Sequence, residues 1–484
     1  AGQDSLTARV DTLRWTLDGT GLDPQTLTTA TTLAATGVQL NQFQLSAVNV
    51  EGRLQEGQLA LDTLSVRSNA FVGSGRGTLA VTDSTAATDF SLRVGITDTA
   101  PLKSLLGAQS LRLQRGRFET RIYGSSLATQ RFDGEVELTG LLYDDVRLAE
   151  ADLTFNGQRG TTQFLQQLEV EGTVGYLSLP SISAERTRVD ATYDGTTTRL
   201  SANVRLDPTH SASLGADVRM TDTETQVTVR SLGLTLEGDR WSLLQEAMIT
   251  VGDRYHIRGL LLESGKQKIT VDGVVDPQGT QSLVTTLESV RLGAVSSLAG
   301  LSGLDGRLSG SLVLTGDAAS PRLITELSLD LRSEDRAVGT LRLDANYEDL
   351  SLALDARLTH ADGSVLTAEG TLPADLRLRT PEPADIDDRP VQFDLSTDRF
   401  PVNWVDPFLD PASVRNVTGT LAASIQIRGT RADPAFSGTA SLKNGGADLP
   451  PLETRYQDAA ATPKMGFNSG KHHQGGRGNL TGQG

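Results

Sequence analysis

The chain has 484 residues, of which 37% are hydrophobic and 49 are glycine, and its formal net charge is −16. The acidic balance argues against nucleic acid as a partner, because binding a phosphate backbone requires a basic surface. The chain contains no cysteine, which excludes disulfides and thiolate-bound metals. The hydrophobic content is modest and reaches the usual range only when the glycines are counted, so each strand has enough apolar surface for one face but not for a thick core.

The beginning of the chain carries no targeting signal. Residues 1–6 have neither a basic segment nor an apolar one, as a signal peptide would need. No stretch approaches the roughly 18 apolar residues that indicate a membrane-spanning helix. The chain opens without Met and enters strand-like alternation at once, so we expect it to be an internal fragment of a longer protein.

Alternation of apolar and polar residues is the main pattern along the chain. Such a period of two predicts antiparallel strands with one apolar and one solvated face. The clearest rows are Phe90, Leu92, Val94 and Ile96; Leu200, Ala202, Val204 and Leu206; Ala212, Leu214, Ala216, Val218 and Met220; and Leu350, Leu352, Leu354, Ala356 and Leu358.

Short glycine-containing segments separate these rows. The pairs Asp194-Gly195, Asp272-Gly273 and Asp362-Gly363 predict hairpin turns, because Asp-Gly supplies the backbone conformations that tight turns require. The Gly-rich stretch 73–77 is also interpreted as a hairpin turn, since no Lys-Ser or Lys-Thr follows it as in a phosphate-binding loop.

One phrase occurs twice. Residues 306–316 read Gly-Arg-Leu-Ser-Gly-Ser-Leu-Val-Leu-Thr-Gly and are followed by Pro321. Residues 419–429 read Gly-Thr-Leu-Ala-Ala-Ser-Ile-Gln-Ile-Arg-Gly and are followed by Pro434. Each copy carries an alternating apolar row: Leu308, Leu312 and Leu314 in the first, and Leu421, Ile425 and Ile427 in the second. A repeated strand unit of this kind indicates a repetitive architecture.

Three segments break the alternation. In residues 101–109, 292–300 and 401–409 the apolar positions are spaced by three and four, which predicts short amphipathic helices, and Asp98 or Thr99 could cap the first. They divide the chain into strand repeats at 1–100, 101–290, 291–400 and 401–462. The Pro- and acid-rich residues 380–390 predict a long loop, and residues 463–484 predict a disordered or artificial tail.

No set of residues forms a credible catalytic or metal-binding constellation. The five histidines do not pair with one another or with carboxylates at zinc-like spacing, and His472-His473 lies in the predicted tail. Asp385, Asp387 and Asp388 lack the Gly and the terminal Glu of a calcium loop. No nucleophile elbow with a histidine partner occurs. We therefore expect no enzymatic activity, no metal and no cofactor.

The repeated phrase, preceded by a short Leu-containing helix, resembles the TamB branch of the AsmA-like proteins of Gram-negative envelopes. Residues 298–321 and 400–438 carry the likeness, and residues 101–134 do so more loosely. The resemblance implies a protein anchored in the inner membrane that crosses the periplasm and transfers phospholipid between membranes or aids assembly of outer-membrane or secreted proteins. It also implies an outer-membrane partner bound through a C-terminal domain, but neither that domain nor the anchor is recognisable in this sequence.

The predicted fold class is therefore all-β: an elongated, repetitive antiparallel sheet that curls into an open groove (a β-taco), with a few short amphipathic helices. A wide sheet coils because its strands twist, and coiling would shelter the apolar face without a second layer. We expect phospholipid acyl chains to lie in this groove. The candidate groove residues are Leu200, Val204, Leu206, Leu214, Val218, Leu312, Leu314, Leu350, Leu352, Leu354, Leu358, Ile425 and Ile427.

Two other kinds of protein share an all-β, strand-rich sequence. An extracellular structural or adhesin-like β-repeat protein would use similar strands without lipid, although the constant coil length and the Asn ladders of a β-helix are not evident. A transmembrane β-barrel would need aromatic girdles, for which seven Tyr and three Trp are too few.

Overall fold

The computed structural model is described here over the residues whose placement is defined. These are residues 8–21, 28–40, 43–55, 57–80, 87–103, 108–125, 130–159, 165–179, 183–236, 238–292, 305–333, 336–378, 386–403, 413–450, 454–461, 464–467 and 480–481.

The described chain is almost entirely β-strand, and neighbouring strands pair in antiparallel ladders. The predicted all-β, repetitive, antiparallel fold is thus confirmed. The chain forms two compact units, and β15 (Thr225–Leu236) contributes residues to both. Unit 1 comprises Ala1–Met220 with Arg230–Thr235, and unit 2 comprises Thr221–Val229 with Leu236–Gly484.

The strands of unit 1 are mostly ten residues or longer. They are β1 (Ala8–Thr20), β2 (Thr28–Leu40), β3 (Phe43–Gln55), β4 (Gln58–Ser68), β5 (Phe71–Ala80), β6 (Thr88–Ile96), β7 (Leu111–Arg112), β8 (Arg115–Gly124), β9 (Arg131–Tyr143), β10 (Val146–Gln158), β11 (Gln167–Ser178), β12 (Ser183–Tyr193), β13 (Thr197–Arg205) and β14 (Ser211–Met220).

The strands of unit 2 after β15 vary more in length. They are β16 (Asp239–Leu243), β17 (Ala247–Val251), β18 (Tyr255–Ser264), β19 (Gln267–Val275), β20 (Thr280–Arg291), β21 (Asp305–Asp317), β22 (Ser320–Ser333), β23 (Arg336–Glu348), β24 (Ser351–His360), β25 (Val365–Pro373), β26 (Gln392–Pro401), β27 (Arg415–Gly429), β28 (Pro434–Leu449), β29 (Thr454–Ala461), β30 (Lys464–Phe467) and β31 (Leu480–Thr481).

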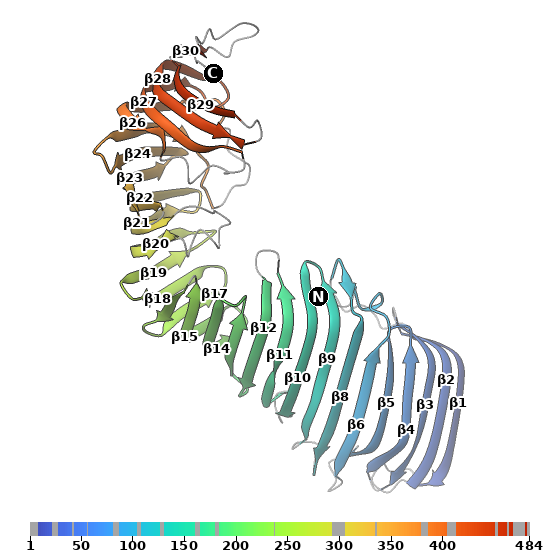
Figure 1. Ribbon diagram of the computed structural model, residues 1–484. Helices are drawn as coiled ribbons and strands as arrows, with labels where there is room; N and C mark the ends of the chain where they lie inside the picture. The colour runs from blue at the N-terminus through green and yellow to red at the C-terminus, as the bar shows by residue number, and fades with distance from the viewer. Residues whose placement is uncertain are drawn as a thin grey trace. The chain divides into compact units, whose positions relative to one another are not determined.

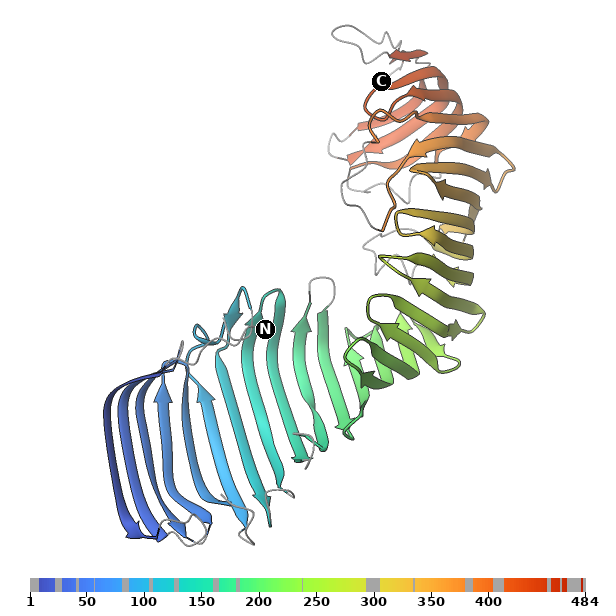
Figure 2. The same cartoon turned by 180° about the vertical axis from the view of Figure 1, so that it is seen from behind.

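Unit 1 is a meander in which strands next to each other in sequence pair. The one interruption is the short β7, which pairs with β9 and leaves β6 to pair with β8. Figure 1 shows these strands side by side, and Figure 2 shows the same layer from behind. Because successive side chains on a strand point to opposite faces, the meander presents two distinct faces.

Unit 2 follows the same plan from β18 to β28. On the side of β18 opposite β19, two short strands pair with different parts of it: β17 with Tyr255–Arg258 and β16 with Leu262–Glu263. At the other end, β28 pairs with both β29 and β30.

The repeated phrase forms the same hairpin twice. Its first copy is β21 with the start of β22, where Gly316 pairs with Pro321; its second is β27 with the start of β28, where Gly429 pairs with Pro434. Both turn glycines have left-handed backbones, with φ of 82° at Gly316 and 102° at Gly429. The phrase therefore repeats because each hairpin needs a residue that tolerates positive φ before its turn.

Two predicted turns are wrong. Asp272-Gly273 lies inside β19, where the Asp272 carboxylate accepts a hydrogen bond of 2.9 Å from the amide of Gly259 at a bulge of β18. The Gly-rich stretch 73–77 lies inside β5, opposite Val94, Leu92 and Phe90 of β6. Here the missing side chains make room for larger neighbours instead of turning the chain.

The predicted helices and tail are seen only in part. Leu102 and Lys103, as well as Leu292, are helical, and the Asp98 carboxylate accepts a hydrogen bond of 2.9 Å from the amide of Ala100, as expected for a cap. Val402 and Asn403 form a short helical turn after β26. Residues 104–107, 293–300 and 404–409 of the predicted helices, including Trp404, lie outside the described residues, as do His472-His473 and Asp385. In the predicted tail, Lys464–Phe467 pairs with β28 and Leu480–Thr481 pairs with β29 as short strands, and the other residues of 463–484 lie outside the described ranges.

We expect Gly429→Ala to lower the stability of unit 2. A Cβ there would approach the carbonyl oxygen of Asp433 to 2.4 Å, and the residue would have to keep its left-handed backbone, which together cost about 1–3 kcal/mol. Gly95→Ala is the control, because a Cβ at Gly95 would have no heavy atom within 4 Å. Thermal and denaturant unfolding should show a loss only for Gly429→Ala, and equal loss in both variants would contradict this explanation.

Candidate functional site

A continuous apolar face crosses unit 1. Its central row can be followed from strand to strand through directly opposed residues, beginning at the edge strand β1. This row, row A, is Trp15, Leu33, Val50, Leu64, Gly75, Leu92, Thr120, Gly134, Phe155, Val170, Ala191, Leu200 and Ala216.

Two further rows flank it on the same face. Row B is Leu13, Ala35, Val48, Val66, Gly73, Val94, Phe118, Val136, Leu153, Gly172, Val189, Ala202 and Leu214. Row C is Leu17, Thr31, Gly52, Leu61, Gly77, Phe90, Ile122, Phe132, Gly157, Leu168, Tyr193, Thr198 and Val218. None of the three rows contains a charged residue.

Glycines in these rows are covered by large side chains from the neighbouring strands. A Cβ on Gly134 would lie 2.5 Å from the ring of Phe155, and one on Gly157 would lie 2.4 Å from the ring of Phe132. The Phe155 ring stacks on Phe118 at 5.6 Å between centroids and meets Phe132 at 6.1 Å. The rings therefore lie over the glycines and give the face a continuous apolar surface.

The hydroxyls of Thr120 in row A and Thr31 in row C bond within the protein. Thr120 Oγ1 donates to the carbonyl of Asp133 at 2.9 Å, and Thr31 Oγ1 accepts from the indole nitrogen of Trp15 at 2.9 Å. These bonds satisfy polar groups that would otherwise penalise contact with an apolar ligand.

Most side chains of the apolar face are half-buried. Phe90 is 6% exposed, whereas Trp15 on the edge strand is 61% exposed. Leu64, Leu92, Phe155 and Leu200 lie between these extremes. Figures 1 and 2 draw no second layer of described strands or helices across β1 to β14. The side chains thus shield one another laterally while their outer surfaces stay accessible.

Unit 2 has an equivalent face. Row D is Leu262, Ile269, Leu287, Gly310, Leu327, Leu343, Ala356, Ala368, Leu395, Ile425 and Gly438. Row E is Leu260, Val271, Thr285, Leu312, Thr325, Ala345, Leu354, Gly370, Phe393, Ile427 and Phe436. Row F is Ile257, Gly273, Leu283, Leu314, Leu323, Tyr347, Leu352 and Leu372. These rows also lack charged residues.

Most of the residues predicted to line the groove lie on these faces. Leu200, Leu214 and Val218 belong to rows A, B and C, and Val204 lies on the same face opposite Ala212. In unit 2, the residues that fall in rows D, E and F are Ile425, Leu312, Leu354, Ile427, Leu314 and Leu352.

Two predicted residues lie elsewhere, and a third is buried on the same face. Leu206 follows the end of β13, where its amide donates to the carbonyl of His210 at 3.0 Å. Leu350 is in the turn before β24 with φ of 63°, so it is not a strand position. Leu358 is only 7% exposed, because it packs with Leu331 and Phe400 in a closed cluster. Leu358 thus shares the face of Leu354, opposite Leu341 and Leu366, but its side chain is buried in a core contact.

The prediction missed the aromatic residues of unit 1. Phe118, Phe132 and Phe155 were not among the candidates, although they form the densest part of the apolar face. The signal was present in the sequence: in residues 132–136 the order Phe-Asp-Gly-Glu-Val alternates as soon as glycine is counted as a member of the apolar row.

The opposite face of unit 1 is charged. Arg93 pairs with Glu119 at 2.9 Å, and Arg117 contacts both Glu119 and Glu137. Hydrogen bonds from Arg93, and then from Arg117, hold the pKa of Glu119 below its ordinary value. Arg121 binds both carboxylate oxygens of Asp89, at 2.7 and 2.8 Å, and this hydrogen bonding lowers the pKa of Asp89.

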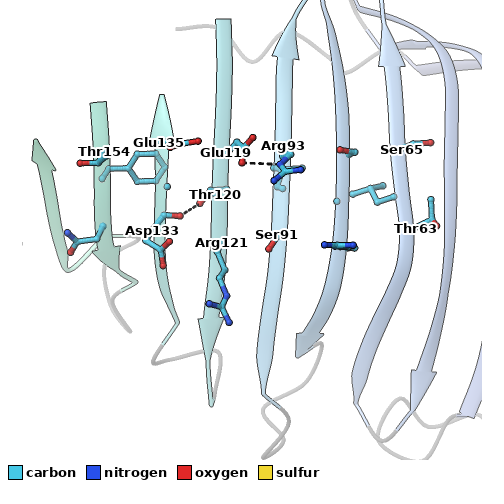
Figure 3. Close-up of a pocket in the computed structure, with 18 of the residues that line it drawn as sticks. Thr63, Ser65, Ser91, Arg93, Glu119, Thr120, Arg121, Asp133, Glu135 and Thr154 are labelled. Atoms are coloured by element: carbon cyan, nitrogen blue, oxygen red, sulfur yellow. Dashed lines mark hydrogen bonds and ion pairs between the residues drawn. The ribbon is translucent and has the colours of Figure 1, made fainter. Parts of the chain in front are cut away.

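A hollow of about 790 Å³ lies over this charged face (Figure 3). On each strand the hollow is lined by one residue of row A and by the polar residues just before and after it, such as Ser91 and Arg93 around Leu92. Because neighbouring side chains on a strand point to opposite faces, the polar side chains form the walls of the hollow and the backbone of row A forms its floor. Glu119 and Arg93 lie next to each other on neighbouring strands in one row of these polar residues, where Figure 3 shows the ion pair that joins them. The hollow is therefore a polar surface groove, separate from the apolar face.

The described residues contain no candidate metal site. No three His, Asp or Glu side chains converge there as a metal site requires. Within the same ranges, no helix has the length and apolar character needed to cross a bilayer. No family model matches the chain, and no curated protein matches it as a relative.

The Arg121–Asp89 pair predicts a pH-dependent difference in stability. Arg121 lowers the pKa of Asp89 in the folded state. The contribution of this pair to the free energy of unfolding is therefore complete above the pKa of Asp89 in the unfolded chain, about 3.9, and is lost as the pH falls through the pKa of Asp89 in the folded protein. Arg121→Gln should thus lower the melting temperature at neutral pH, with a difference from the parent chain that shrinks below about pH 4.

The control for this prediction is Arg76→Gln, which removes a cation from the same polar face. The described residues give Arg76 no ion-pair partner, so its effect on melting temperature should not follow the titration of one carboxylate. A difference between Arg121→Gln and the parent chain that stays constant from neutral to acidic pH would contradict the assigned role of the pair.

Proposed function

We propose that the apolar faces of the two units hold the acyl chains of phospholipids, and that the protein carries such lipids as a β-groove protein of the TamB or AsmA-like type. The observation that carries the proposal is the absence of any charged residue from rows A to F. An acyl chain lying on any of these rows meets only aliphatic, aromatic, glycine and threonine residues.

The energetics favour such a ligand. Each methylene removed from water contributes roughly 0.8 kcal/mol, so moving a two-chain lipid from a bilayer into water costs tens of kcal/mol. An apolar face with accessible side chains replaces part of the bilayer and lowers this cost at each strand. Curling of the sheet around the chains, which its twist favours, would increase the contact area.

The charged face complements this role. Its ion pairs, such as Arg93–Glu119 and Arg121–Asp89, keep one side of the sheet hydrated while the other binds lipid. Carrying acyl chains along a sheet requires neither a catalytic group nor a cofactor, so the chain need not be an enzyme.

The resemblance supports the biological setting of the proposal. The two hairpins of the repeated phrase are built alike, and it is this phrase that resembles the TamB branch. On this basis we propose a periplasmic location in a Gram-negative envelope, with phospholipid transfer or assembly of outer-membrane proteins as the role of the whole protein.

A charge on the apolar face should prevent lipid binding where it is placed. Leu354 lies in row E between Ala345 and Gly370, whereas its neighbour Ala353 is exposed on the opposite face between Asn346 and Thr371. A guanidinium facing acyl chains costs several kcal/mol. We expect Leu354→Arg to reduce crosslinking of a photoreactive-acyl phospholipid to β23–β25 by about tenfold or more, because each 1.4 kcal/mol is a factor of ten.

Ala353→Arg is the matched control and should leave the crosslinking unchanged, and Leu354→Met should retain it. Circular dichroism of each variant checks that the sheet is intact. If Leu354→Arg and Ala353→Arg crosslink equally, the one-sided lipid face is wrong.

The chain purified from a membrane-containing host should carry bound phospholipid. The exposed apolar surface of both units would otherwise face water, so mass spectrometry under native conditions is expected to find one or more lipids per chain. A chain that is consistently free of lipid, and that takes up none from vesicles, would favour the structural or adhesin-like alternative.

A further inference from the structure

A short segment of unit 2 runs across the ends of two neighbouring hairpins. Residues 374–378, which we call the strap, directly follow β25. The amide of Ala374 donates to the carbonyl of Leu350 in the β23–β24 turn at 3.0 Å, and the amide of Leu378 donates to the carbonyl of Ala318 in the β21–β22 turn at 3.0 Å. The strap therefore spans from one hairpin to the next at the turn end of the strands.

Between these two bonds, a side chain ties the strap to the apolar face. The amide of Leu376 donates to the hydroxyl oxygen of Tyr347 at 3.1 Å. Tyr347 belongs to row F and is 1% exposed, whereas Leu323 and Leu352, which lie opposite it on the neighbouring strands, are half-buried. Row F is thus closed at β23, where the strap meets it, and accessible on either side.

The strap itself has little buried surface. None of its side chains is buried, and Leu376 and Leu378 are 42% and 43% exposed. Its two charged side chains bind each other, because Arg377 donates to both carboxylate oxygens of Asp375 at 2.8 Å. A segment with so few buried apolar contacts opens at a lower free energy than the sheet to which it is bonded.

We propose that the strap is a lid on row F: it closes the row at Tyr347, and it opens the row to an acyl chain when it lifts. Rows D and E have no such cover at β23, because Leu343 and Ala345 are half-buried there. With the strap down, lipid passes β23 over rows D and E alone; with the strap lifted, row F joins them. This inference rests on the proposed function, because it assigns a means of regulating the same apolar face.

The hydrogen bond between Leu376 and Tyr347 can be removed from either side. Tyr347→Phe removes the acceptor and keeps the ring in row F, and Leu376→Pro removes the donor. Both variants should raise the hydrogen-exchange rates of the amides of Ala374 and Leu378 about fivefold or more, because the bond no longer opposes opening of the strap. Tyr255→Phe is the control: Tyr255 is 47% exposed at the start of β18, and no hydrogen bond among the described residues joins it to the strap.

Crosslinking of the photoreactive-acyl phospholipid gives the second measurement. In the parent chain we expect crosslinks at Leu354 in row E and few at position 347 in row F. In Tyr347→Phe and in Leu376→Pro, crosslinks at position 347 should increase about threefold or more, because the lifted state is more populated. Crosslinks at Leu354 should stay unchanged, and circular dichroism checks that the sheet is intact in each variant.

The outcomes separate the lid from the proposed function. Strap exchange that is unchanged in both variants would overturn the lid, because the bond would then not hold the strap. Faster exchange without more crosslinking at position 347 would overturn it too, while crosslinks at Leu354 would still support the proposed function. If neither the parent chain nor the variants crosslink anywhere on the apolar faces, the proposed function is wrong, and a lid for acyl chains is wrong with it.

Discussion

The hydrogen-bonded register between neighbouring strands is the constraint on which both faces depend. A slip of one residue at any strand pair would move that strand's apolar set to the charged face. The registers instead keep apolar side chains opposite apolar side chains through every strand from β1 to β14 except the two-residue β7. The ion pairs of the other face, such as Arg93–Glu119, reinforce the same register because they join directly opposed residues.

The bulges show how strictly the two faces are kept apart. In β4, β18 and β20 the register shifts between Leu61 and Leu64, between Ile257 and Leu260, and between Leu287 and Val290. In each case the two apolar residues on either side of the shift are three positions apart in the sequence, and both lie on the apolar face. An extra residue is thus accommodated without moving the apolar set to the charged face.

The general architecture could be predicted from the sequence because alternation and the repeated phrase are local signals. Leu352, Leu354, Ile425 and Ile427 were placed correctly on this basis. The failures have physical causes. Gly73–Gly77 and Asp272-Gly273 have the composition of turns, but tertiary neighbours place them inside strands. The burial of Leu358 depends on Phe400, which is distant in sequence and becomes its neighbour only through the registers.

The meander connectivity also determines how the protein can fold. Since nearly all pairings join consecutive strands, each new contact closes only a short loop, and the entropy of loop closure stays small. A sheet with this connectivity can grow by one hairpin at a time from strands that are already ordered. Such growth suits a polypeptide that emerges gradually from a ribosome or a translocation pore, because no strand has to wait for a distant partner to be synthesised.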